Sequence, residues 1–472
     1  MSTIEINQLG EGGTHLDQPQ LAELSRRLDG SLLLPGDPGW DSAIQTWNGM
    51  VATTPALVIQ PRSPGDVSTS VTFAREHGLS ISMRGGGHNI AGTSIAPGGV
   101  TFNMSLMSSV LVEAEARLVH VDSGCLLGNV DNATQEKGLA TVLGFVSETG
   151  VAGLTLGGGF GYLTRRFGWT VDNLEEVEIV TADGEIRVAS RRQHDELFWA
   201  IRGGSGNFGV VTRFTFRLHE VGPLITGGLI AWDARRSDEV LGTYRELTAT
   251  APRELTTAVI VRLAPAAPFV PEQWHGRKVA AMVVCYTGHN PESALAPIRK
   301  LGQPVVDTIR PMPYVHLQSM LNALEPKGPH RYWKTEFLPG LSEGFLAAFR
   351  DGALGVTSPL SQSVIFHVGG ELNDHPDDDG AVGNRDAQFI GGFAGTWPPD
   401  VAPEPHINWV RESWARIRQY STGGNYVNFQ LADDDQERLM AAYRGNYQRL
   451  REVKAAYDPD NFFRVNRNIS PA

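Results

Sequence analysis

Three glycine-rich stretches of the chain lie beside residues that could do chemistry. The first, RGGGH, places the imidazole of His88 directly after three glycines. Backbone N–H groups in such a loop can bind an anion such as a pyrophosphate, and an imidazole at its mouth can contact a ligand or bond to it. An isolated histidine is also common as a purely structural residue. The pattern therefore indicates an anion-binding loop and leaves both roles open for His88.

Two further stretches repeat the pattern, GVAGLTLGGGFG over 150–161 and RGGSGNFG over 202–209. Glycine costs backbone entropy in regular structure, so three clusters favour close backbone approach to a bulky ligand. The last contains the letters Gly-x-Gly-x-x-Gly, which in dinucleotide-binding folds follow a strand and open a helix. Here a helix is predicted before the letters, ending at Ile201, and a strand after them, over 210–218. This inverted order argues against an NAD site.

Hydrophobic patterning predicts the elements that must position these loops. Strands are expected early in the chain over 56–60, 79–83, 100–104, 109–113, 118–121, 177–181, 185–189 and 210–218, and helices over 18–28, 63–77 and 126–137. Longer strands are expected over 224–232, 256–263, 278–286, 331–337 and 361–368, with helical stretches between them. Helices over 406–420 and 433–456 precede a turn-rich tail. An α+β protein is therefore expected.

Composition excludes several classes of protein. Asp plus Glu outnumber Lys plus Arg by 52 to 40, a formal net charge of −12 that argues against nucleic acid as a partner. No apolar run reaches the ~18 residues that cross a membrane, and the first residues lack a signal-peptide pattern. Two cysteines cannot form a disulfide framework, and the acidic run 377–379 lacks the spacing of a calcium loop. We expect a soluble cytoplasmic protein without metal or membrane contact.

The three glycine stretches belong to a longer series of motifs with a family resemblance. RGGGHNIAG is followed by ETGVAGLTLGGGFGYLTRRFG, DELFWAIRGGSGNFGVVT, YVNF and YDPDNFFRVNRNI. In this order they resemble the berberine bridge enzyme-like FAD-linked oxidases of the vanillyl-alcohol oxidase superfamily, most of all bacterial members of secondary metabolism. The resemblance implies a two-subdomain PCMH-type FAD-binding domain over 1–221. A substrate domain over 222–405, with a mostly antiparallel sheet backed by helices, and a segment over 406–472 that returns to the FAD domain are implied as well.

The resemblance also implies how FAD is held. The histidine of the first loop is bonded to the flavin in this family, and here it is His88. A second, cysteinyl link occurs in many members at the position of Val146, and Cys125 does not match it, so a single covalent bond is expected. The other cofactor-binding positions that match the family are Arg84, Gly85, Gly86, Gly87, Asn89, Gly92, Ser147, Thr149, Gly150, Gly153, Gly157, Gly158, Gly161, Gly209, Val211, Tyr426, Asn428, Asn466 and Asn468.

The catalytic base is where this sequence departs from the family pattern. The tyrosine and glutamate that relatives use are replaced by Phe429 and Val364, and neither side chain can take a proton. Four other candidates are therefore carried forward: Tyr332, Lys334, Glu148 and His367. Tyr332 and Lys334 share one face of a predicted strand, and His367 lies on the face opposite Val364. Lys334 could also be a solvated strand residue, and Glu148 a salt-bridge partner.

The reaction implied is that of a flavin oxidase. Substrate would lose a hydride to flavin N5 while a base removes an O–H or N–H proton, and O2 would reoxidise the flavin to give H2O2. Val151 is expected beside the flavin where oxygen enters. Tyr332, Trp333 and Trp397 suggest a sizeable organic substrate such as an alcohol, sugar, alkaloid or polyketide. A monomer or homodimer is expected. A flavin dehydrogenase or monooxygenase, and more distantly a non-catalytic flavin-binding protein, are the alternatives.

Overall fold

The structure is a computed structural model that describes residues 3–10 and 12–472. A four-stranded sheet near the N-terminus has the order β3-β4-β6-β5, in which β6 is parallel to both β4 and β5. Its strands are β3 (Ser31–Leu33), β4 (Leu57–Gln60), β5 (Ile81–Arg84) and β6 (Val100–Asn103). The connecting helix α3 (Pro64–Glu76) starts where Ser63 accepts a hydrogen bond from the Asp66 N–H. Because β5 ends at Arg84, the RGGGH loop leaves the end of a buried strand.

A five-stranded antiparallel sheet carries the other glycine loops. Its order is β11-β10-β12-β8-β7. Its strands are β7 (Val110–Glu113), β8 (Leu118–Asp122), β10 (Leu174–Val180), β11 (Ile186–Ser190) and β12 (Val210–Arg217). Helix α4 (Leu127–Gln135) follows β8, and α7 (Asp195–Ile201) follows β11. The Gly-x-Gly-x-x-Gly letters lie between α7 and β12, so the predicted helix-then-strand order is confirmed.

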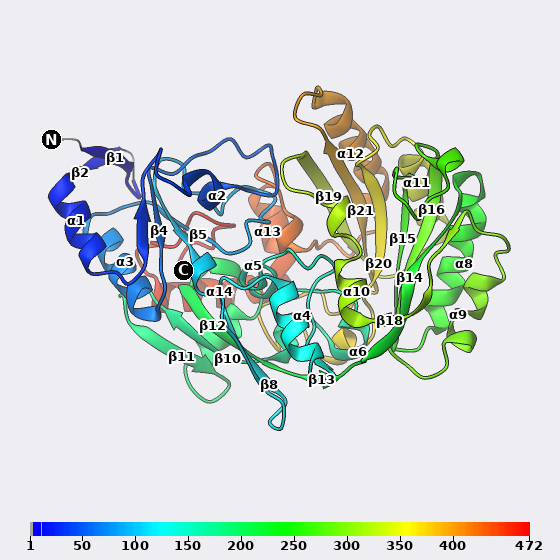
Figure 1. Ribbon diagram of the computed structural model, residues 1–472, viewed down its shortest axis with the longest axis horizontal. Coiled ribbons are helices and arrows are strands. Elements are labelled where there is room, and N and C mark those ends of the chain that lie inside the picture. The colour runs from blue at the N-terminus through cyan, green and yellow to red at the C-terminus, as the bar shows by residue number, and fades with distance from the viewer. Residues whose placement is uncertain (1–2, 11) are drawn as a thin grey trace.

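An eight-stranded sheet forms the other end of the molecule (Figure 1). The path is β17-β14-β16-β15-β20-β21-β19, with β18 beside β14, and all its pairs are antiparallel. Its strands are β14 (Leu224–Asp233), β15 (Leu255–Leu263), β16 (Lys278–Tyr286), β17 (Val306–Asp307), β18 (Arg310–Pro313), β19 (His330–Leu338), β20 (Gln362–His367) and β21 (Phe389–Trp397).

Helices cover one face of this sheet, as the sequence predicts. They are α8 (Ser237–Thr250), α9 (Pro291–Arg299), α11 (Glu343–Ala353) and α12 (Glu404–Ile417). Trp232, Val259 and Val261 alternate onto this face and pack with the helices in one core. The opposite face contacts residues of the first domain, such as Val142 and Tyr162. The sheet is therefore buried on both sides.

Strand β21 was not predicted from the sequence, because its run FIGGFAGTW is rich in glycine, which is unfavourable in strands. The glycines are required by packing in this central strand. A Cβ on Gly392 would lie 2.1 Å from the Lys334 carbonyl oxygen of β19. The N-terminal hairpin of β1 (Ile4–Asn7) and β2 (Gly13–Leu16) was missed too; it is held by buried Ile6 and Leu16.

The C-terminal segment returns to the first domain later than the expected boundary at 405. Helix α12 packs on the large sheet through Trp409 and Val410. The helices that follow, α13 (Gln436–Tyr443) and α14 (Tyr447–Tyr457), bury Tyr443 and Leu450 in the core of the five-stranded sheet. Shorter helices include α1 (Gln18–Arg26), α2 (Trp40–Ile44), α5 (Val151–Leu156), α6 (Thr164–Phe167) and α10 (Tyr314–Ser319). No helix within the described residues combines the length and apolar character that a bilayer span requires.

Candidate functional site

A cavity of about 360 Å³ lies between the glycine loops and the face of the eight-stranded sheet that is turned away from its helices. All three glycine stretches contribute to its wall, although they come from distant parts of the sequence. The predicted cofactor-binding residues that line it are Gly85, Gly86, Gly87, His88, Asn89, Val146, Thr149, Gly150, Gly153, Gly209, Val211, Tyr426, Asn428 and Asn466. The fold thus assembles one concave site from the separate motifs.

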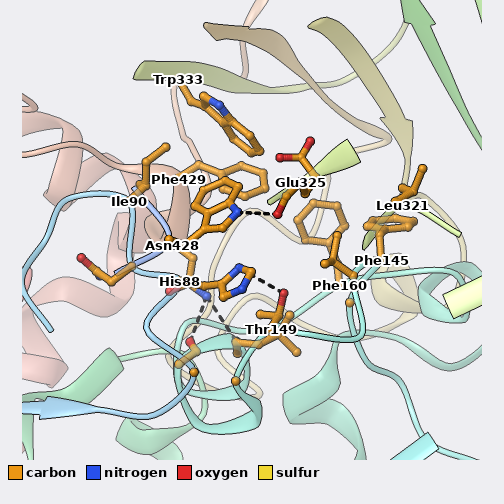
Figure 2. A pocket seen from close by; sticks show the side chains of 18 of the residues that line it. His88, Ile90, Phe145, Thr149, Phe160, Leu321, Glu325, Trp333, Asn428 and Phe429 are labelled. Carbon is orange, nitrogen blue, oxygen red and sulfur yellow. Dashed lines mark hydrogen bonds between the residues drawn. The ribbon is translucent and has the colours of Figure 1, made fainter. Parts of the chain in front are cut away.

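His88 is a neutral imidazole on the cavity wall (Figure 2). Burial, with a smaller contribution from the positive charges of Lys327, Arg331 and Arg84, lowers the pKa of His88 to about 3. Its Nδ1 lies 3.5 Å from the Thr149 hydroxyl, while its buried Nε2 has no hydrogen-bond partner among the described residues. A neutral ring with an unpaired nitrogen can act as a nucleophile at ordinary pH.

The first loop needs glycine because two loops meet there. A Cβ on Gly86 would lie 2.4 Å from the backbone nitrogen of Gly150, and Gly87 has φ +74°. Arg84 was expected to contact pyrophosphate, but its buried guanidinium donates instead to the Gln45 carbonyl at 2.6 and 3.2 Å. Arg84 therefore fixes the base of the loop and lies behind the cavity wall.

Several other predicted cofactor residues do not contribute to the cavity wall. They are Gly92, Ser147, Gly157, Gly158, Gly161 and Asn468, none of which is in the lining described. A Cβ on Gly161 would lie 1.8 Å from the Leu143 carbonyl oxygen. Ser147 accepts a hydrogen bond from Asn322 Nδ2 at 2.7 Å, which joins the two domains. Val151 is fully buried in the core, although its neighbours Gly150 and Ala152 line the cavity.

Three of the four predicted C-terminal residues, Tyr426, Asn428 and Asn466, line the cavity. Tyr426 accepts a hydrogen bond from the Gly159 N–H at 3.1 Å and another from Asn428 Nδ2 at 2.9 Å. Asn428 Nδ2 also donates to the Gly153 carbonyl at 3.1 Å. The side-chain oxygens of Asn466 and Asn468 are buried without a partner. Such unpaired groups are costly unless a ligand satisfies them.

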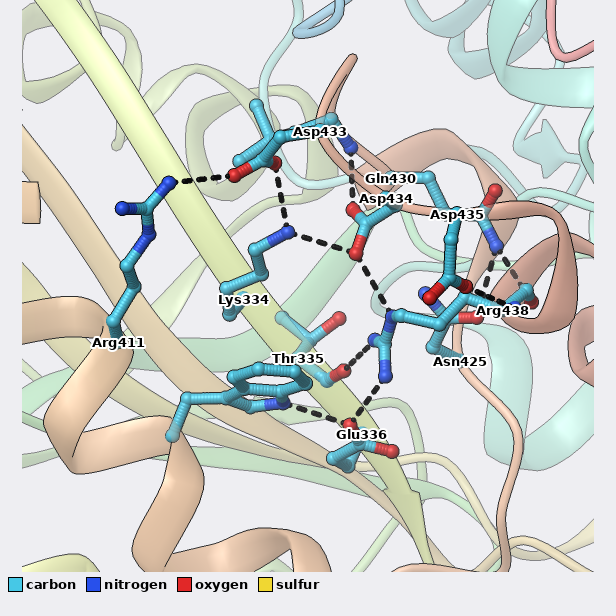
Figure 3. Close-up of polar contacts among 12 residues, drawn as sticks. Lys334, Thr335, Glu336, Arg411, Asn425, Gln430, Asp433, Asp434, Asp435 and Arg438 are labelled. Carbon is cyan, nitrogen blue, oxygen red and sulfur yellow. Dashed lines mark hydrogen bonds and ion pairs between the residues drawn. The ribbon is translucent and has the colours of Figure 1, made fainter.

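Tyr332 and Lys334 do not reach the cavity, because they lie on the helix-covered face of β19. Lys334 Nζ is buried and donates to Asp433 at 2.9 Å and to Asp434 at 2.7 Å (Figure 3). Tyr332 donates to Asp433 Oδ2 at 2.6 Å, and its pKa is raised by burial. Trp333, between them in sequence, lines the cavity instead. The strand period was predicted correctly, and the choice of face was wrong.

Glu148 and His367 are also absent from the described lining. Glu148 is exposed to solvent. His367 is buried on the opposite face of β20 from Val364, stacks on Phe389, and has a pKa lowered by burial and by Arg165. None of the four candidate bases therefore lies in the described wall of this cavity.

Apolar side chains occupy the positions where relatives carry their bases. Phe429 and Val364 both line the cavity, as expected from the family pattern. Trp333 meets Phe429 edge to face with ring centroids 5.3 Å apart, and Phe145 stacks on Phe366 at 4.9 Å. Trp397 was considered for the substrate site but is fully buried in the helix-covered core. The wall above the loops is mainly aromatic.

Sequence reasoning missed a carboxylate that does face the cavity. Glu325 lines it together with Arg262 and Gln362. Burial raises the pKa of Glu325, and the nearby Arg331 and Arg262 partly oppose that shift. Glu325 lies in an irregular segment, ALEPKG, with no periodicity that would assign it a face. No sequence signal could have singled it out.

Comparison with known proteins gives consistent matches along the chain. Residues 55–190 match the FAD binding domain family, and residues 425–470 match the berberine and berberine-like family. An FAD-linked oxidoreductase of Dictyostelium discoideum is 30% identical over 456 residues, covering 95% of this chain and 96% of that protein.

Two further comparisons concern enzymes named for the same substrate. The (R)-6-hydroxynicotine oxidase of Paenarthrobacter nicotinovorans is 30% identical over 462 residues, covering 94% of this chain and 97% of that one. The crystal structure of 6-hydroxy-D-nicotine oxidase from Arthrobacter nicotinovorans superposes with a TM-score of 0.81 at 27% identity, covering 97% of this chain and 100% of that chain.

Proposed function

This chain belongs to the berberine-like family of FAD-linked oxidoreductases, and on that premise we propose that it is an oxidase with FAD bonded only to His88. The observation that carries the proposal is the buried, neutral His88 imidazole, whose Nε2 lacks a partner among the described residues. Val146 stands at the family's second attachment position and offers no sulfur. Cys125 is buried in the core, with a pKa raised to about 12.

The residues of the cavity fit FAD. The glycine loops present backbone rather than side chains to the cavity, and Gly209 has φ +157° where a Cβ would lie 2.5 Å from the Val180 carbonyl oxygen. Unpaired buried oxygens of Asn466 and Asn468 lie close in sequence to the lining residues Val465 and Arg467. His88, Asn89 and Thr149 from the first two loops, with Tyr426 and Asn428, would hold the flavin end.

FAD, when bound, supplies the acceptor for a hydride from the substrate carbon and passes the electrons on to O2. The protein itself positions the reacting groups and excludes water from them. Thr149 and Trp47 hold the His88 ring, and the aromatic residues Trp333, Phe366 and Phe429 exclude water around the reacting carbon. An apolar wall of this kind suits a small organic substrate, in line with the relatives that are named as oxidases.

Covalent attachment is tested by denaturing the purified yellow protein with acid. Flavin should sediment with the wild-type protein and remain in solution for His88→Ala, whereas Cys125→Ser should behave as wild type. Soluble flavin from the wild type would contradict the covalent link.

Oxidase chemistry is tested by following O2 uptake with a panel of small alcohols and amines, beginning with (R)-6-hydroxynicotine. One H2O2 formed per O2 consumed is expected. Anaerobic flavin bleaching without peroxide formation in air would instead indicate a dehydrogenase or monooxygenase.

A further inference from the structure

Glu325 is held in the cavity wall by hydrogen bonds to both its backbone and its side chain. Its backbone carbonyl accepts a hydrogen bond from Trp47 Nε1 at 3.0 Å, and Trp47 in turn stacks on His88 with ring centroids 5.2 Å apart. Its Oε1 accepts from Gln362 Nε2 at 3.1 Å. Glu325 is therefore one aromatic ring away from the residue proposed to carry the flavin (Figure 2).

Arg262 fixes the direction of the hydrogen bond to Glu325. Arg262 Nη1 lies 3.5 Å from Gln362 Oε1, to which it donates, and its Nη2 donates to the Pro359 carbonyl at 3.2 Å. Because the amide oxygen of Gln362 faces a cation, its NH2 group must face Glu325. The two residues are opposite each other on β15 and β20, both on the cavity face.

The second carboxylate oxygen of Glu325 is left available. Within the part of the chain that the structure describes, the nearest cation to Oε2 is Arg331 Nε at 3.8 Å, beyond hydrogen-bond distance. Arg331 from β19 and Arg262 from β15 are the charged groups that face Glu325, and Gln362 is its hydrogen-bond donor. Burial outweighs these groups and raises the pKa of the carboxyl. A raised pKa brings a carboxyl nearer to the range in which it can exchange protons at working pH.

We propose that Glu325 is the catalytic base of this enzyme, taking the O–H or N–H proton of the substrate at Oε2. The inference rests on the proposed oxidase function. It assigns to the segment between α10 and β19 the task that Phe429 and Val364 cannot perform at the family's usual positions.

The rest of the cavity specifies the body of the substrate. The sheet face beyond Arg262 is apolar, and Phe269 and Val270 of the loop that follows β15 lie beside it. The residues of this apolar lobe are Leu229, Ala231, Ile260, Ala264, Phe269, Val270, Val279, Ala281, Val305 and Val306. The matching substrate is an elongated apolar molecule that carries a single proton-donating group at the Glu325 end.

The reaction balances with the flavin as the oxidant. For an alcohol, the O–H proton passes to Glu325 Oε2 while the C–H hydrogen leaves with its electron pair as a hydride to the flavin, and a C=O bond forms. The substrate is oxidised by two electrons. When O2 then takes up two electrons and two protons to give H2O2, the proton on Glu325 is released and the carboxylate is restored.

The binding test uses 4-hexylphenol and its methyl ether, 4-hexylanisole, titrated by calorimetry into the flavin-loaded protein. Wild type should prefer the phenol by about tenfold or more, since a hydrogen bond to a charged group is at stake, and this preference should grow as pH rises and Glu325 ionises. Glu325→Gln should lose the preference and its pH dependence, and Glu325→Asp should keep both in weaker form. An unchanged preference in Glu325→Gln would overturn the proposal.

The kinetic test follows anaerobic flavin bleaching by a substrate found in the oxygen screen. Glu325→Gln should slow bleaching about 100-fold or more, while Glu246→Gln on the exposed side of α8 should not change it. Equal bleaching by Glu325→Gln and wild type would refute the role of Glu325 and leave the oxidase standing. If acid precipitation released the flavin from the wild type, the His88 link would be refuted, and the role of Glu325 would be unaffected.

Discussion

Trp47 lies flat against His88, with their ring centroids 5.2 Å apart and their planes 12° from parallel. Trp47 also contacts Arg331 of the substrate domain. The Arg331 guanidinium lies 3.8 Å from the indole centroid and donates to the Trp47 carbonyl at 2.7 Å. One indole thus ties the ring proposed to hold the flavin to the strand that bears Trp333. The orientation of His88 depends on how the two domains meet.

Replacing this indole should impair flavin attachment. Trp47→Leu removes the stacked ring, so we expect slower covalent incorporation of FAD into apoprotein and a loss of stability of about 3 kcal/mol. Trp47→Phe keeps a ring and should retain most of the incorporation rate. The measurement is acid-precipitable flavin against time, with urea unfolding in parallel. Normal incorporation by Trp47→Leu would show that the stacking does not orient His88.

The pH dependence of attachment follows from the lowered pKa of His88. An ordinary imidazole, with a pKa near 6.5, would lose about 30-fold of its neutral form between about pH 8 and about pH 5. His88, with a pKa of about 3, stays neutral over that range. The attachment rate should therefore change less than about twofold, which timed acid precipitation at each pH can check. A fall that follows a pKa near 6.5 would show that His88 is solvated in the apoprotein.

Lys334 should prove structural. Lys334→Met removes one of the two cations that contact the buried carboxylate of Asp434 and leaves Arg438 at 2.9 Å and the Leu431 N–H at 2.7 Å; breaking a buried ion pair costs about 3–5 kcal/mol. We expect that loss in urea unfolding, with the rate of flavin bleaching changed less than about threefold at a temperature where the variant is folded. Adding Asp434→Asn should restore part of the stability. If Lys334→Met abolished flavin bleaching while its stability was unchanged, Lys334 would again be a candidate for the catalytic base.

Asp131 should make stability depend on pH. It is buried on α4, its Oδ2 accepts from Gln318 Nε2 at 2.8 Å, and burial raises its pKa to about 7. A carboxyl with a raised folded-state pKa contributes stability that is complete below the unfolded pKa near 3.9 and is lost as pH rises through about 7. Asp131→Asn should therefore be more stable than wild type by a few kcal/mol at about pH 8.

The same variant should be close to wild type at about pH 3, below both pKa values, where the carboxyl is mostly protonated in the folded and the unfolded state. Its amide supplies the donor that a neutral carboxyl would offer to Gln318 Oε1, which has no partner among the described contacts. Urea unfolding at the two pH values measures the difference. Equal stability of the two proteins at both would show that Asp131 is not held neutral.

The sequence alone determined the features that are encoded by neighbouring residues. The RGGGH, GVAGLTLGGGFG and RGGSGNFG loops, the helix-then-strand order around the last of them and the family itself follow from residues that are adjacent in the chain. Strand periodicity also placed Tyr332 and Lys334 on one face of β19 correctly. Such local patterns survive because backbone conformation is decided by a few consecutive residues.

Only the tertiary structure decided which side chains line the cavity. The large sheet is buried on both faces, so the alternation along β19 could not indicate whether Lys334 or Trp333 faces the cavity. Strand β21 was not predicted because its glycines are unfavourable in strands, and the reason for them, close contact with β19, is visible only in the fold. Glu325 reaches the cavity because Trp47 and Gln362, 278 and 37 residues away, hold it there. Long-range contacts of this kind leave no period or motif in the sequence, since each partner is set by packing between domains.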